Sequence, residues 1–352
     1  DRFINEAIDQ IVITRPTIVK KIVRVKKISV PSLFDLSNAA IFPATIAAPT
    51  PRRRRIIVKS SANGSFITYI MIMKMIESSE VVKIFLDYEI SNIKDEKKYT
   101  ISPLDGITNN TVVVGVDNKK FVLRIPGKNP DVINRKSEKL NSIRAYEAGL
   151  TLPFILFDEI TGIKISEYFD IYTYKQQDFN NKEMRMNAFY ILNELHNSDL
   201  VLEENFSPLK VFHNIADASH SVEKEAIEVA SNVIKKINEI GIKNVPCHQD
   251  LYHANFVIYE NKTILIDWEY SSMGDSYFDY ADLFWQNEFD HNDEFKKSSL
   301  IEIGIESDED IEKFEYFEML SMITWGLWAL RRSPNDNAVS YTHLRAHETL
   351  QH

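Results

Sequence analysis

The chain has 352 residues, enough for one large domain or two lobes with a substantial core. Apolar residues make up 44% and charged residues 26%, and the net charge of −10 argues against a generally basic, nucleic-acid-binding protein. The single cysteine excludes a disulfide framework within the chain and fits a reducing compartment. No run of about 18 apolar residues is present, so we expect no membrane span and a cytoplasmic location.

The first part of the chain differs from the rest. Residues 1–75 hold 13 Lys and Arg against 4 Asp and Glu, which gives them a net charge of +9. Residues 1–70 contain PRRRR and scattered β-branched residues without a clear amphipathic period, and three methionines follow directly. We interpret residues 1–70 as a non-native or disordered extension. A basic targeting or RNA-binding arm and a genuine domain are the alternatives.

Residues 76–170 predict a small antiparallel sheet with one helix. TVVVGVDNKKFVLRIPG (111–127) contains two β-rich runs around Asp-Asn, which indicates a hairpin, and FILFDEITGIKISEYF (154–169) contains two more around Thr-Gly. Residues 137–149 have the pattern of a helix that ends at a glycine. We assign this segment to an N-terminal, nucleotide-binding lobe.

Residues 171–335 are expected to form a larger, mainly helical lobe that holds the catalytic loop, the metal and the substrate. Its predicted helices lie at 183–197, 221–240, 279–289 and 309–332. A small β-rich lobe followed by a larger helical one predicts a cleft between them. The last residues, 338–352, include VSYTHLRAHET, which resembles a sequencing adapter read in one frame. We therefore expect this tail to carry no function.

A polar loop, PCHQDLYHANF (246–256), precedes the hydrophobic hairpin FVIY-ENK-TILIDW. If Asn261 is the centre of this hairpin, Asn255 lies opposite Asp267 and their Cβ atoms are about 5 Å apart on one face. An amide and a carboxylate there form an oxygen pair suited to Mg²⁺. Asp250 reaches the same place from the loop, so the loop is predicted to set a base beside a metal-bound phosphate.

The spacing H-x-D-x-x-x-x-N, followed by an apolar-Ile-Asp segment, matches the kinase catalytic loop and its metal-binding Asp. A lone Asp or Asn would indicate only an ordinary polar loop. His248, at the start of the pattern, is expected to hold the loop backbone. His253 is interpreted as a loop or supporting residue, and Cys247 as buried packing, since no thiol-activating partner is evident.

Asn109, Arg124 and Glu138 are predicted to form part of the nucleotide site through charge or a polar turn. Asn109, in LDGITNNTVVVG, belongs to a polar turn that could cover phosphates, although no full G-x-G-x-x-G is present. Arg124 stands where kinases place a phosphate-binding Lys, and it can chelate phosphate oxygens with two donors. A surface Arg at a strand end is the alternative. Its predicted ion-pair partner is Glu138, with Glu147 as the second choice.

The segment Glu167-Tyr168-Phe169 is predicted to be the hinge between the lobes. Its backbone groups would be offered to adenine.

Four stretches carry a resemblance to a known family: FVLRIPG, CHQDLYHANF, LIDWEYSSMGDSYFDYADLF and TWGLWAL. Through them residues 76–332 resemble the choline/ethanolamine kinase family, particularly its bacterial LicA-type choline kinases, within the aminoglycoside-phosphotransferase-like kinase fold. The resemblance implies an α+β, two-lobed protein-kinase-like fold, with a small antiparallel sheet in one lobe. It also implies ATP as donor, Asp250 as catalytic base, Asn255 and Asp267 as Mg²⁺ ligands, and Glu269 as support for the metal region.

The predicted acceptor is a small amino alcohol, with choline first. A quaternary ammonium has no hydrogen to donate, so aromatic faces and nearby negative charge recognise it. Trp325 and Trp328 stand at i, i+3 on one helix face, although core packing is the alternative for both. Tyr270, Gln286 and Glu288 complete the predicted substrate site. The family usually has an acid where this chain has Gln286, and Glu288 is expected to compensate.

Three rival functions remain open at this point. A kinase for aminoglycosides or another amino alcohol would favour an acidic, less aromatic pocket. A nucleotide-binding pseudokinase is disfavoured by the intact set of Asp250, Asn255 and Asp267. A nucleic-acid-binding protein would have to use PRRRR. We expect a small-molecule partner and no nucleic acid, and the sequence does not indicate an oligomeric state.

Overall fold

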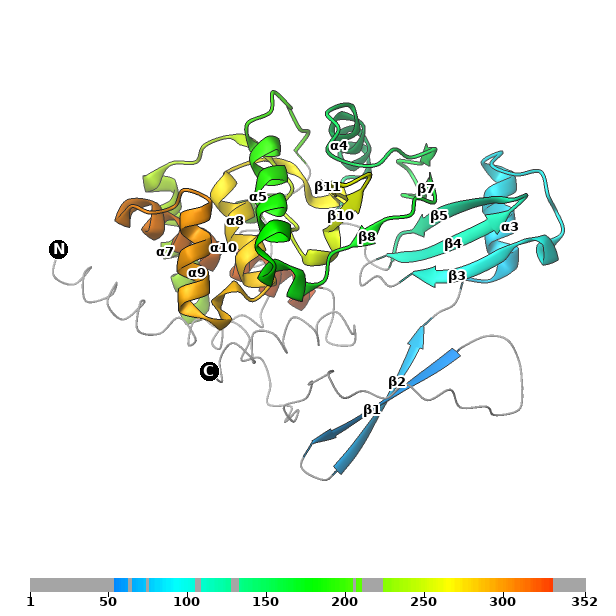
Figure 1. Ribbon diagram of the computed structural model, residues 1–352, viewed down its shortest axis with the longest axis horizontal. Coiled ribbons are helices and arrows are strands. Elements are labelled where there is room, and N and C mark those ends of the chain that lie inside the picture. The colour runs from blue at the N-terminus through cyan, green and yellow to red at the C-terminus, as the bar shows by residue number, and fades with distance from the viewer. Residues whose placement is uncertain are drawn as a thin grey trace. The chain divides into compact units, whose positions relative to one another are not determined.

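The computed structural model describes residues 54–62, 65–73, 76–104, 109–127, 133–204, 207–210 and 224–331 (Figure 1). Within them the chain forms two compact units, one ending at Arg124 and the other starting at Ile125. The predicted tail at 338–352 and residues 1–53 lie outside the described residues. The predicted boundary between the lobes, near residue 170, differs from this division between residues 124 and 125 and stays a prediction.

The smaller unit contains a hairpin, a helix and a run of three strands. Its elements are β1 Arg54–Ala62, β2 Ser65–Met73, α3 Ser78–Asp87, β3 Thr100–Leu104, β4 Asn110–Val116 and β5 Lys119–Ile125. β1 pairs with β2 and β3 with β4, both antiparallel, and β5 is the other neighbour of β4. The predicted hairpin at 111–127 is confirmed. Its two turn residues, Asp117 and Asn118, have φ of 51° and 59°, as the right-handed twist of a two-residue hairpin requires.

The helix α3 was absent from the sequence interpretation, which expected one helix before residue 170. Its apolar residues form one face, which buries Val81, Val82, Ile84 and Phe85. The Phe85 ring packs edge to face against Tyr99 and Phe121, with ring centroids 5.8 and 5.5 Å apart. These contacts join α3 to the buried side of β5.

The larger unit is mainly helical. Its helices are α4 Arg135–Glu147, α5 Lys182–His196, α7 Lys224–Ile240, α8 Ser276–Gln286, α9 Asp293–Glu302 and α10 Asp308–Arg331. Its short strands are β6 Leu156–Phe157, β7 Lys164–Glu167, β8 Tyr172–Thr173, β9 Val245–Cys247, β10 Phe256–Tyr259, β11 Lys262–Leu265 and β12 Ser272–Gly274. All five predicted helices are present, whereas α9, β8, β9 and β12 were not predicted.

Helix α8 begins three residues before its predicted start. The Asp275 side chain accepts a hydrogen bond from the Tyr277 N–H at 3.0 Å, so it caps the first turn and fixes the earlier start. Asp279 and Asp282 lie on the buried side of this helix. Among the helices of the described chain, none is both long enough and apolar enough to cross a membrane.

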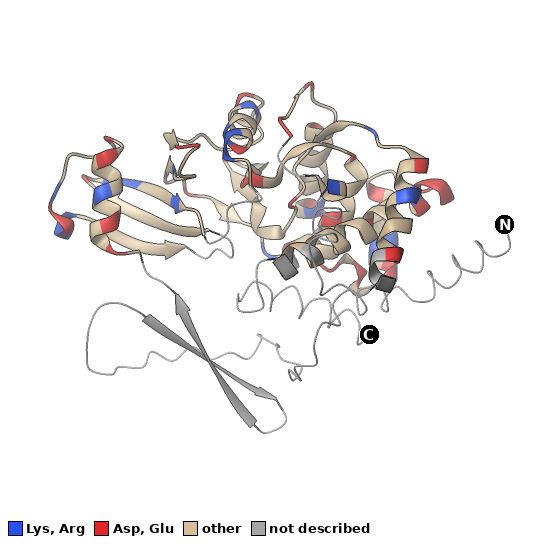
Figure 2. Ribbon diagram, turned by 180° about the vertical axis from the view of Figure 1, so that it is seen from behind, with Lys and Arg blue, Asp and Glu red and all other residues tan. Residues whose placement is uncertain are grey.

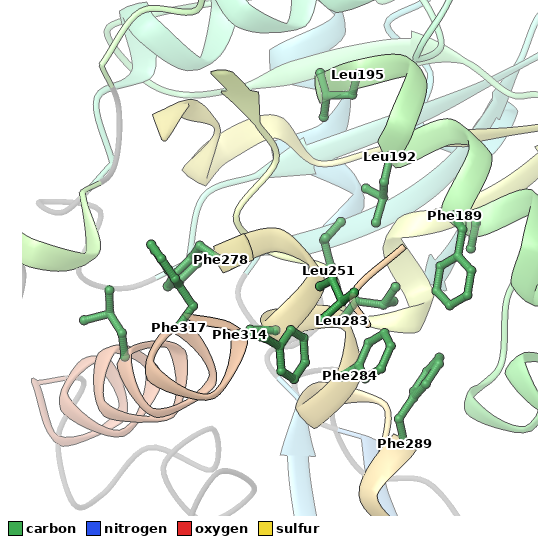
Figure 3. Close-up of a cluster of buried hydrophobic side chains, with 14 of the residues drawn as sticks. Phe189, Leu192, Leu195, Leu251, Phe278, Leu283, Phe284, Phe289, Phe314 and Phe317 are labelled. Carbon is green, nitrogen blue, oxygen red and sulfur yellow. The ribbon is translucent and has the colours of Figure 1, made fainter. Parts of the chain in front are cut away.

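The core of the larger unit gathers where α5, α8 and α10 meet the catalytic loop. Figure 3 shows Leu251, from the predicted catalytic loop, among Leu192 of α5, Leu283 of α8 and Phe314 of α10. Leu251 has no exposed surface. At about 25 cal/mol for each Å² of apolar surface, a fully buried leucine stabilises the fold by about 2 kcal/mol. The loop is therefore anchored in the core by the residue next to Asp250.

Acidic and basic residues of the described chain are interspersed along the ribbon in both units rather than collected by sign (Figure 2). Surface ion pairs such as Lys235 with Glu239, 3.8 Å apart, are exposed and contribute little. More deeply buried contacts between charged groups, such as Arg135 with Glu138 and Lys313 with Asp275, lie in the larger unit.

Removal of the N-terminal extension tests its place in the fold. The pairing of β1 with β2 runs from Arg54 to Met73 and thus includes the end of residues 1–70. A chain that begins at Met71 loses this hairpin. We expect it to keep the melting temperature and turnover of the full chain, measured by circular dichroism and a coupled assay. A marked fall in melting temperature would assign the hairpin to the folded domain.

Candidate active site

The predicted catalytic loop leaves β9, which pairs with β12, and it re-enters the structure at β10. Gln249 has a φ of 64°, a left-handed conformation that turns the chain sharply before Asp250. Its side-chain amide donates to Ser272 Oγ at 2.8 Å, and Ser272 belongs to β12. The loop is thus tied sideways to the neighbouring strand.

Asp279 of α8 clamps the start of the loop. Its two carboxylate oxygens accept hydrogen bonds from the consecutive backbone N–H groups of His248 and Gln249, both at 2.9 Å. One of these oxygens also lies 2.8 Å from Nε2 of His196 on α5. Asp279 is fully buried, so these partners satisfy a charge that water cannot reach.

His248 performs the role predicted for it. Its Nε2 bonds the carbonyl of Ile266, at 2.9 Å, and so ties the loop to the end of the β10–β11 hairpin. Burial lowers its pKa, which keeps the ring neutral. The neighbouring Cys247 is fully buried, and burial raises its thiol pKa well above the usual range. Cys247 is therefore packing, as predicted, although its sulfur lies near His196 and Asp279.

Asp282, one turn after Asp279, holds the second half of the loop. It accepts from the Leu251 N–H at 2.8 Å, the Ser321 hydroxyl at 2.6 Å and the Trp325 indole N–H at 2.7 Å. The Gln286 amide donates to it as well, at 2.8 Å. Burial raises the pKa of Asp282 to about 6, and these donors oppose the rise. Asp282 thus connects the loop to α10.

Asp250 lies among other acids. Burial, and then the charges of Asp282, Asp267 and Glu269, raise its pKa well above the usual range, while a hydrogen bond from Gln286 lowers it. The Asn255 side-chain amide donates to the Asp250 backbone carbonyl at 2.8 Å, which closes the loop on itself. A carboxylate with a raised pKa accepts a proton more readily than an ordinary Asp, as a general base requires.

The predicted register of the β10–β11 hairpin is wrong by one residue. The turn has two residues, Glu260 and Asn261, with φ of 49° and 62°, so Tyr259 pairs with Lys262. Asn255 therefore faces Ile266, whose N–H donates to the Asn255 carbonyl at 2.9 Å. Asp267 follows in a left-handed conformation with a φ of 65°. The direction of its side chain is therefore set by this backbone turn and not by the pairing of the two strands.

A cluster of acids and one base surrounds Asp267. Carboxylate oxygens of Glu138, Asp267 and Glu269 all lie within 4.8 Å of one another. Arg135 Nη1 lies 2.6 Å from Glu138 and 3.1 Å from Glu269. Oxygen donors of this type fit a hard divalent cation such as Mg²⁺, which takes one or two carboxylates and keeps its other positions for water and phosphate.

The residues predicted to bind nucleotide are divided between the units. Arg124, buried at the end of β5, and Asn109, half-buried before β4, belong to the smaller unit. Glu138, Glu167 and Phe169 belong to the larger one. Glu138 is paired with Arg135, a partner that the sequence did not suggest. The pairing of Arg124 with Glu138 stays a prediction.

The predicted hinge, residues 167–169, lies within the larger unit. Glu167 is the exposed last residue of β7, and the Phe169 ring packs on Tyr259, with centroids 5.2 Å apart. Its role towards adenine stays a prediction.

Three of the predicted substrate residues form a separate aromatic cluster. Tyr270, Trp325 and Trp328 are buried against one another, apart from the main core. Their ring centroids are 5.2, 6.3 and 5.6 Å apart, with edge-to-face geometry in each pair. Glu288 has a φ of 58° and bonds Gln176. His253, as expected of a loop residue, is held through its backbone N–H by Asn287 at 2.8 Å.

Three contributors were missed from the sequence: Arg135, His196 and Asp282. Asp279 and Asp282 stand three residues apart, as do Arg135 and Glu138, so each pair shares one helix face. That spacing was the available signal. The partner that gives each residue its role lies more than 30 positions away in the chain, which spacing does not show.

The site belongs to a known family. Residues 101–314 match the family model described as choline/ethanolamine kinase. The chain belongs to the choline/ethanolamine kinase family. The match includes both the acid cluster and the catalytic loop. A curated relative is the protein LicA of Haemophilus influenzae, 30% identical over 204 residues, which cover 55% of this chain and 60% of LicA. This chain thus spans less than two thirds of that relative.

Solved structures show the same fold. The choline kinase LicA of Streptococcus pneumoniae aligns with a TM-score of 0.64 and 27% identity, covering 78% of this chain and 99% of its own. A structure of LicA in complex with AMP aligns at 26% identity, with a TM-score of 0.63 and coverage of 78% and 98%. The GDP complex of aminoglycoside 2′-phosphotransferase-IIIa, at 13% identity, a TM-score of 0.54 and coverage of 78% and 99%, shares the fold alone. The predicted two-lobed, kinase-like α+β fold is confirmed.

Proposed function

We propose that the protein is an ATP- and Mg²⁺-dependent kinase that phosphorylates the hydroxyl of a small amino alcohol, with choline as the main acceptor. The observation that carries the proposal is the chain of contacts from Asp250 through Gln286 and Asp282 to Trp325. It joins a base on a kinase-type loop to an aromatic cluster. A cation bound at that cluster would bring its hydroxyl towards a base.

Asp250 is assigned the role of base for the acceptor hydroxyl. The loop backbone around it is held at four N–H groups, by Asp279, Asp282 and Asn287. Such a backbone cannot shift when substrate binds, so the carboxylate is preorganised. Asn255 and Asp267 are assigned to Mg²⁺, with Glu269 in support, and Mg²⁺ would neutralise charge on the transferring phosphate. The nucleotide contacts remain assigned to Arg124, Asn109, Glu138, Glu167 and Phe169.

Choline recognition is assigned to Tyr270, Trp325 and Trp328. The three rings are buried against one another with edge-to-face geometry, and cations bind to the faces of such rings. The carboxylates of Asp282 and Glu288 supply negative charge in the same region. We place the protein in the cytoplasm, where ATP is the abundant phosphate donor.

A substrate screen tests the proposal. Choline, ethanolamine and an aminoglycoside are offered in turn with Mg·ATP, and ADP release is measured by a coupled assay. We expect the highest kcat/KM for choline. A preference for the aminoglycoside would support the rival function of an aminoglycoside kinase. Absence of turnover with every acceptor would support a nucleotide-binding protein without transferase activity.

Trp328→Leu tests the aromatic cluster. Trp328 is preferred to Trp325 because the Trp325 indole also holds Asp282, so its loss would disturb the catalytic loop. Loss of one cation–π contact of about 0.5–2 kcal/mol predicts a 2- to 30-fold rise in KM for choline. KM for ATP should be unchanged, and Trp328→Phe should recover most of the loss. Lower stability with an unchanged choline KM would show that Trp328 is core.

Gln286→Glu tests the residue between the two acids. The sequence suggested that an acid here would favour choline, but the Gln286 amide donates to Asp282 and to Asp250. A carboxylate would remove both donors and add a third negative charge, which raises the pKa of Asp250 further. Asp250 in the variant should therefore take up its proton at a higher pH than in the original protein. We expect the loss of activity on acidification to begin at that higher pH. The acid limb of the kcat/KM profile for choline measures this shift, and an unmoved or lowered limb would refute it.

A further inference from the structure

Gln249, the residue directly before Asp250, has a backbone conformation that glutamine seldom adopts. Its φ of 64° lies in the left-handed region, where a Cβ crowds the following carbonyl oxygen. Asn and Asp are tolerated there because their short side chains bond the local backbone, which the longer glutamine does not favour. Backbone strain of this kind persists only where the surrounding structure enforces it, and it gathers at functional sites.

The side-chain amide of Gln249 is also in an unfavourable place. Its Nε2 donates to Ser272 Oγ at 2.8 Å, and this hydroxyl donates in turn to the Met273 carbonyl at 3.2 Å. Because the hydroxyl gives its one hydrogen to Met273, it accepts from Gln249, which fixes the orientation of the amide. The amide oxygen Oε1 is then buried with no hydrogen-bond partner among the described residues, which is unfavourable in a protein interior.

The space for this amide is left by Gly274. Ser272 and Gly274 are two residues apart in β12, so they face the same side of the strand. A Cβ on Gly274 would lie 2.8 Å from Gln249 Nε2, closer than such atoms approach, whereas its 3.6 Å contact with Cys247 Sγ would be ordinary. The φ of Gly274 is not left-handed, so its backbone does not require glycine. The missing side chain therefore makes room for Gln249.

Gln249 is held on two elements at once. Its backbone N–H donates to Asp279 Oδ1 of α8 at 2.9 Å, and its side chain is bonded to β12. The torsion angle φ describes rotation about the bond between the backbone nitrogen and Cα, and the two attachments lie on opposite ends of that bond. A relaxed φ would move the side chain relative to the N–H, so both hydrogen bonds could not survive it. They form a lock on this torsion angle.

We propose that Gln249 is a positioning residue for phosphoryl transfer, which locks the left-handed turn that directs Asp250 towards the acceptor. The lock rests on the proposed kinase function and deepens it. Rotation about the locked bond would swing the backbone that carries Asp250. The strain and the unpaired amide oxygen are tolerated because they accompany a fixed direction of the base. Gln249 is assigned no contact with substrate and acts through Asp250.

Gln249→Met removes the amide and keeps the length of the side chain. We expect kcat for choline to fall about 10- to 100-fold, since a displacement of about 1 Å at a reacting group costs about 10²-fold. The Kd for Mg·ATP, measured by calorimetry, should not change. The melting temperature should not fall, because the variant loses the unpaired amide oxygen together with the hydrogen bond. A folded variant that keeps more than half of kcat would overturn the proposal.

Ser272→Ala removes the other partner of the same hydrogen bond. If both residues act through that bond, the double variant should have the kcat of the more severe single variant. Ser299→Ala is the matched control, because Ser299 of α9 is also buried and its hydroxyl has no partner among the described residues. The control should leave kcat unchanged. Losses that multiply in the double variant would show that Gln249 and Ser272 act separately, against the proposal.

Gly274→Ala tests the lock by steric means. The added Cβ displaces the amide, so kcat should fall by a similar factor in a chain that still carries Gln249. An unchanged kcat in the folded variant would contradict the lock. If Gly274→Ala did not fold, the cycle of Gln249→Met and Ser272→Ala would decide.

Hydrogen exchange separates this proposal from the proposed function, because it needs no substrate. In Gln249→Met the backbone N–H groups of residues 248–253 should exchange about 2- to 10-fold faster, which corresponds to the loss of one hydrogen bond. Those of α10 should not change. Unaltered exchange in the loop would overturn the proposal whichever acceptor is used. Absence of choline turnover in the original protein would contradict the proposed function, and the exchange result would still decide whether Gln249 locks the turn.

Discussion

Replacement of Asp250 by Asn is expected to reduce kcat for choline phosphorylation by about 10²- to 10⁴-fold, the usual contribution of a general base. Asn has nearly the same shape and can still accept from Gln286, but it cannot take the proton of the hydroxyl. The backbone bond from Asn255 to residue 250 is unaffected by the change. Steady-state kinetics with saturating ATP and choline measure the loss. Retention of more than half of kcat would remove Asp250 from the mechanism.

The same substitution is expected to leave the fold as stable or more stable. Burial and nearby acids raise the pKa of Asp250 in the folded protein, so its ionised form costs folding free energy at neutral pH. Asn removes this cost above the raised pKa. The difference in melting temperature should vanish below the ordinary value of 3.8, where Asp is neutral in both states. Such a stability gain at an active site accompanies loss of function.

Asp290→Asn is the matched control. Burial also raises the pKa of Asp290, followed by the charge of Glu318, but this residue lies between α8 and α9 and touches none of the loop backbone bonds. It should show the same direction of stability change at neutral pH with kcat unaltered. If both variants lost activity equally, the effect of Asp250→Asn would come from the removal of a buried negative charge and not from the loss of a catalytic base.

Asp267→Asn is expected to abolish Mg²⁺-dependent turnover or to move its Mg²⁺ requirement upward at least about tenfold, because an amide lacks the charge that a hard cation needs. Asn is chosen because residue 267 has a φ of 65°, a conformation that Asn tolerates. Activity measured against Mg²⁺ concentration at fixed ATP shows the change. An unaltered Mg²⁺ titration would contradict the assignment.

Two further variants separate charge from backbone strain. Asp267→Ala loses the same charge and adds about 1 kcal/mol of strain, so it should be less stable than Asp267→Asn but equally inactive. Asn255→Ala should weaken the Mg²⁺ response less, since an amide offers only a dipole. If Asn255→Ala were the more severe variant, its bond to the Asp250 carbonyl rather than the metal would be the reason.

The larger elements were predictable because their causes are local. The apolar period of α5, α7 and α10 and the turn at Asp117 and Asn118 placed these elements within a few residues. Where the boundary depended on a cap, as with Asp275 at α8, the prediction began three residues late. The helix α3 was missed although its buried face is plain, because it directly follows the segment interpreted as an extension.

The catalytic loop was predictable from spacing, but the hairpin after it was not. Glu260-Asn261 lacks the Asn-Gly or Asp-Gly pair that identifies a two-residue turn, so a one-residue shift in register could not be recognised. The argument that placed Asn255 opposite Asp267 was therefore wrong, even though Asp250 and Asp267 do share one electrostatic environment. Likewise, Arg135 acquires its role from Glu269, 134 positions away, and no local pattern indicates that contact.

The burial of Cys247 has a practical consequence for spectroscopy. It is the only cysteine of the chain, it has no exposed surface, and its raised pKa keeps it as the unreactive thiol. The protein can therefore be labelled at a single introduced cysteine without first removing the native one. Ile160, 92% exposed in the turn that ends at Gly162, is a suitable position. A fluorophore there would report on the β6–β7 segment as Mg·ATP and choline are added in turn.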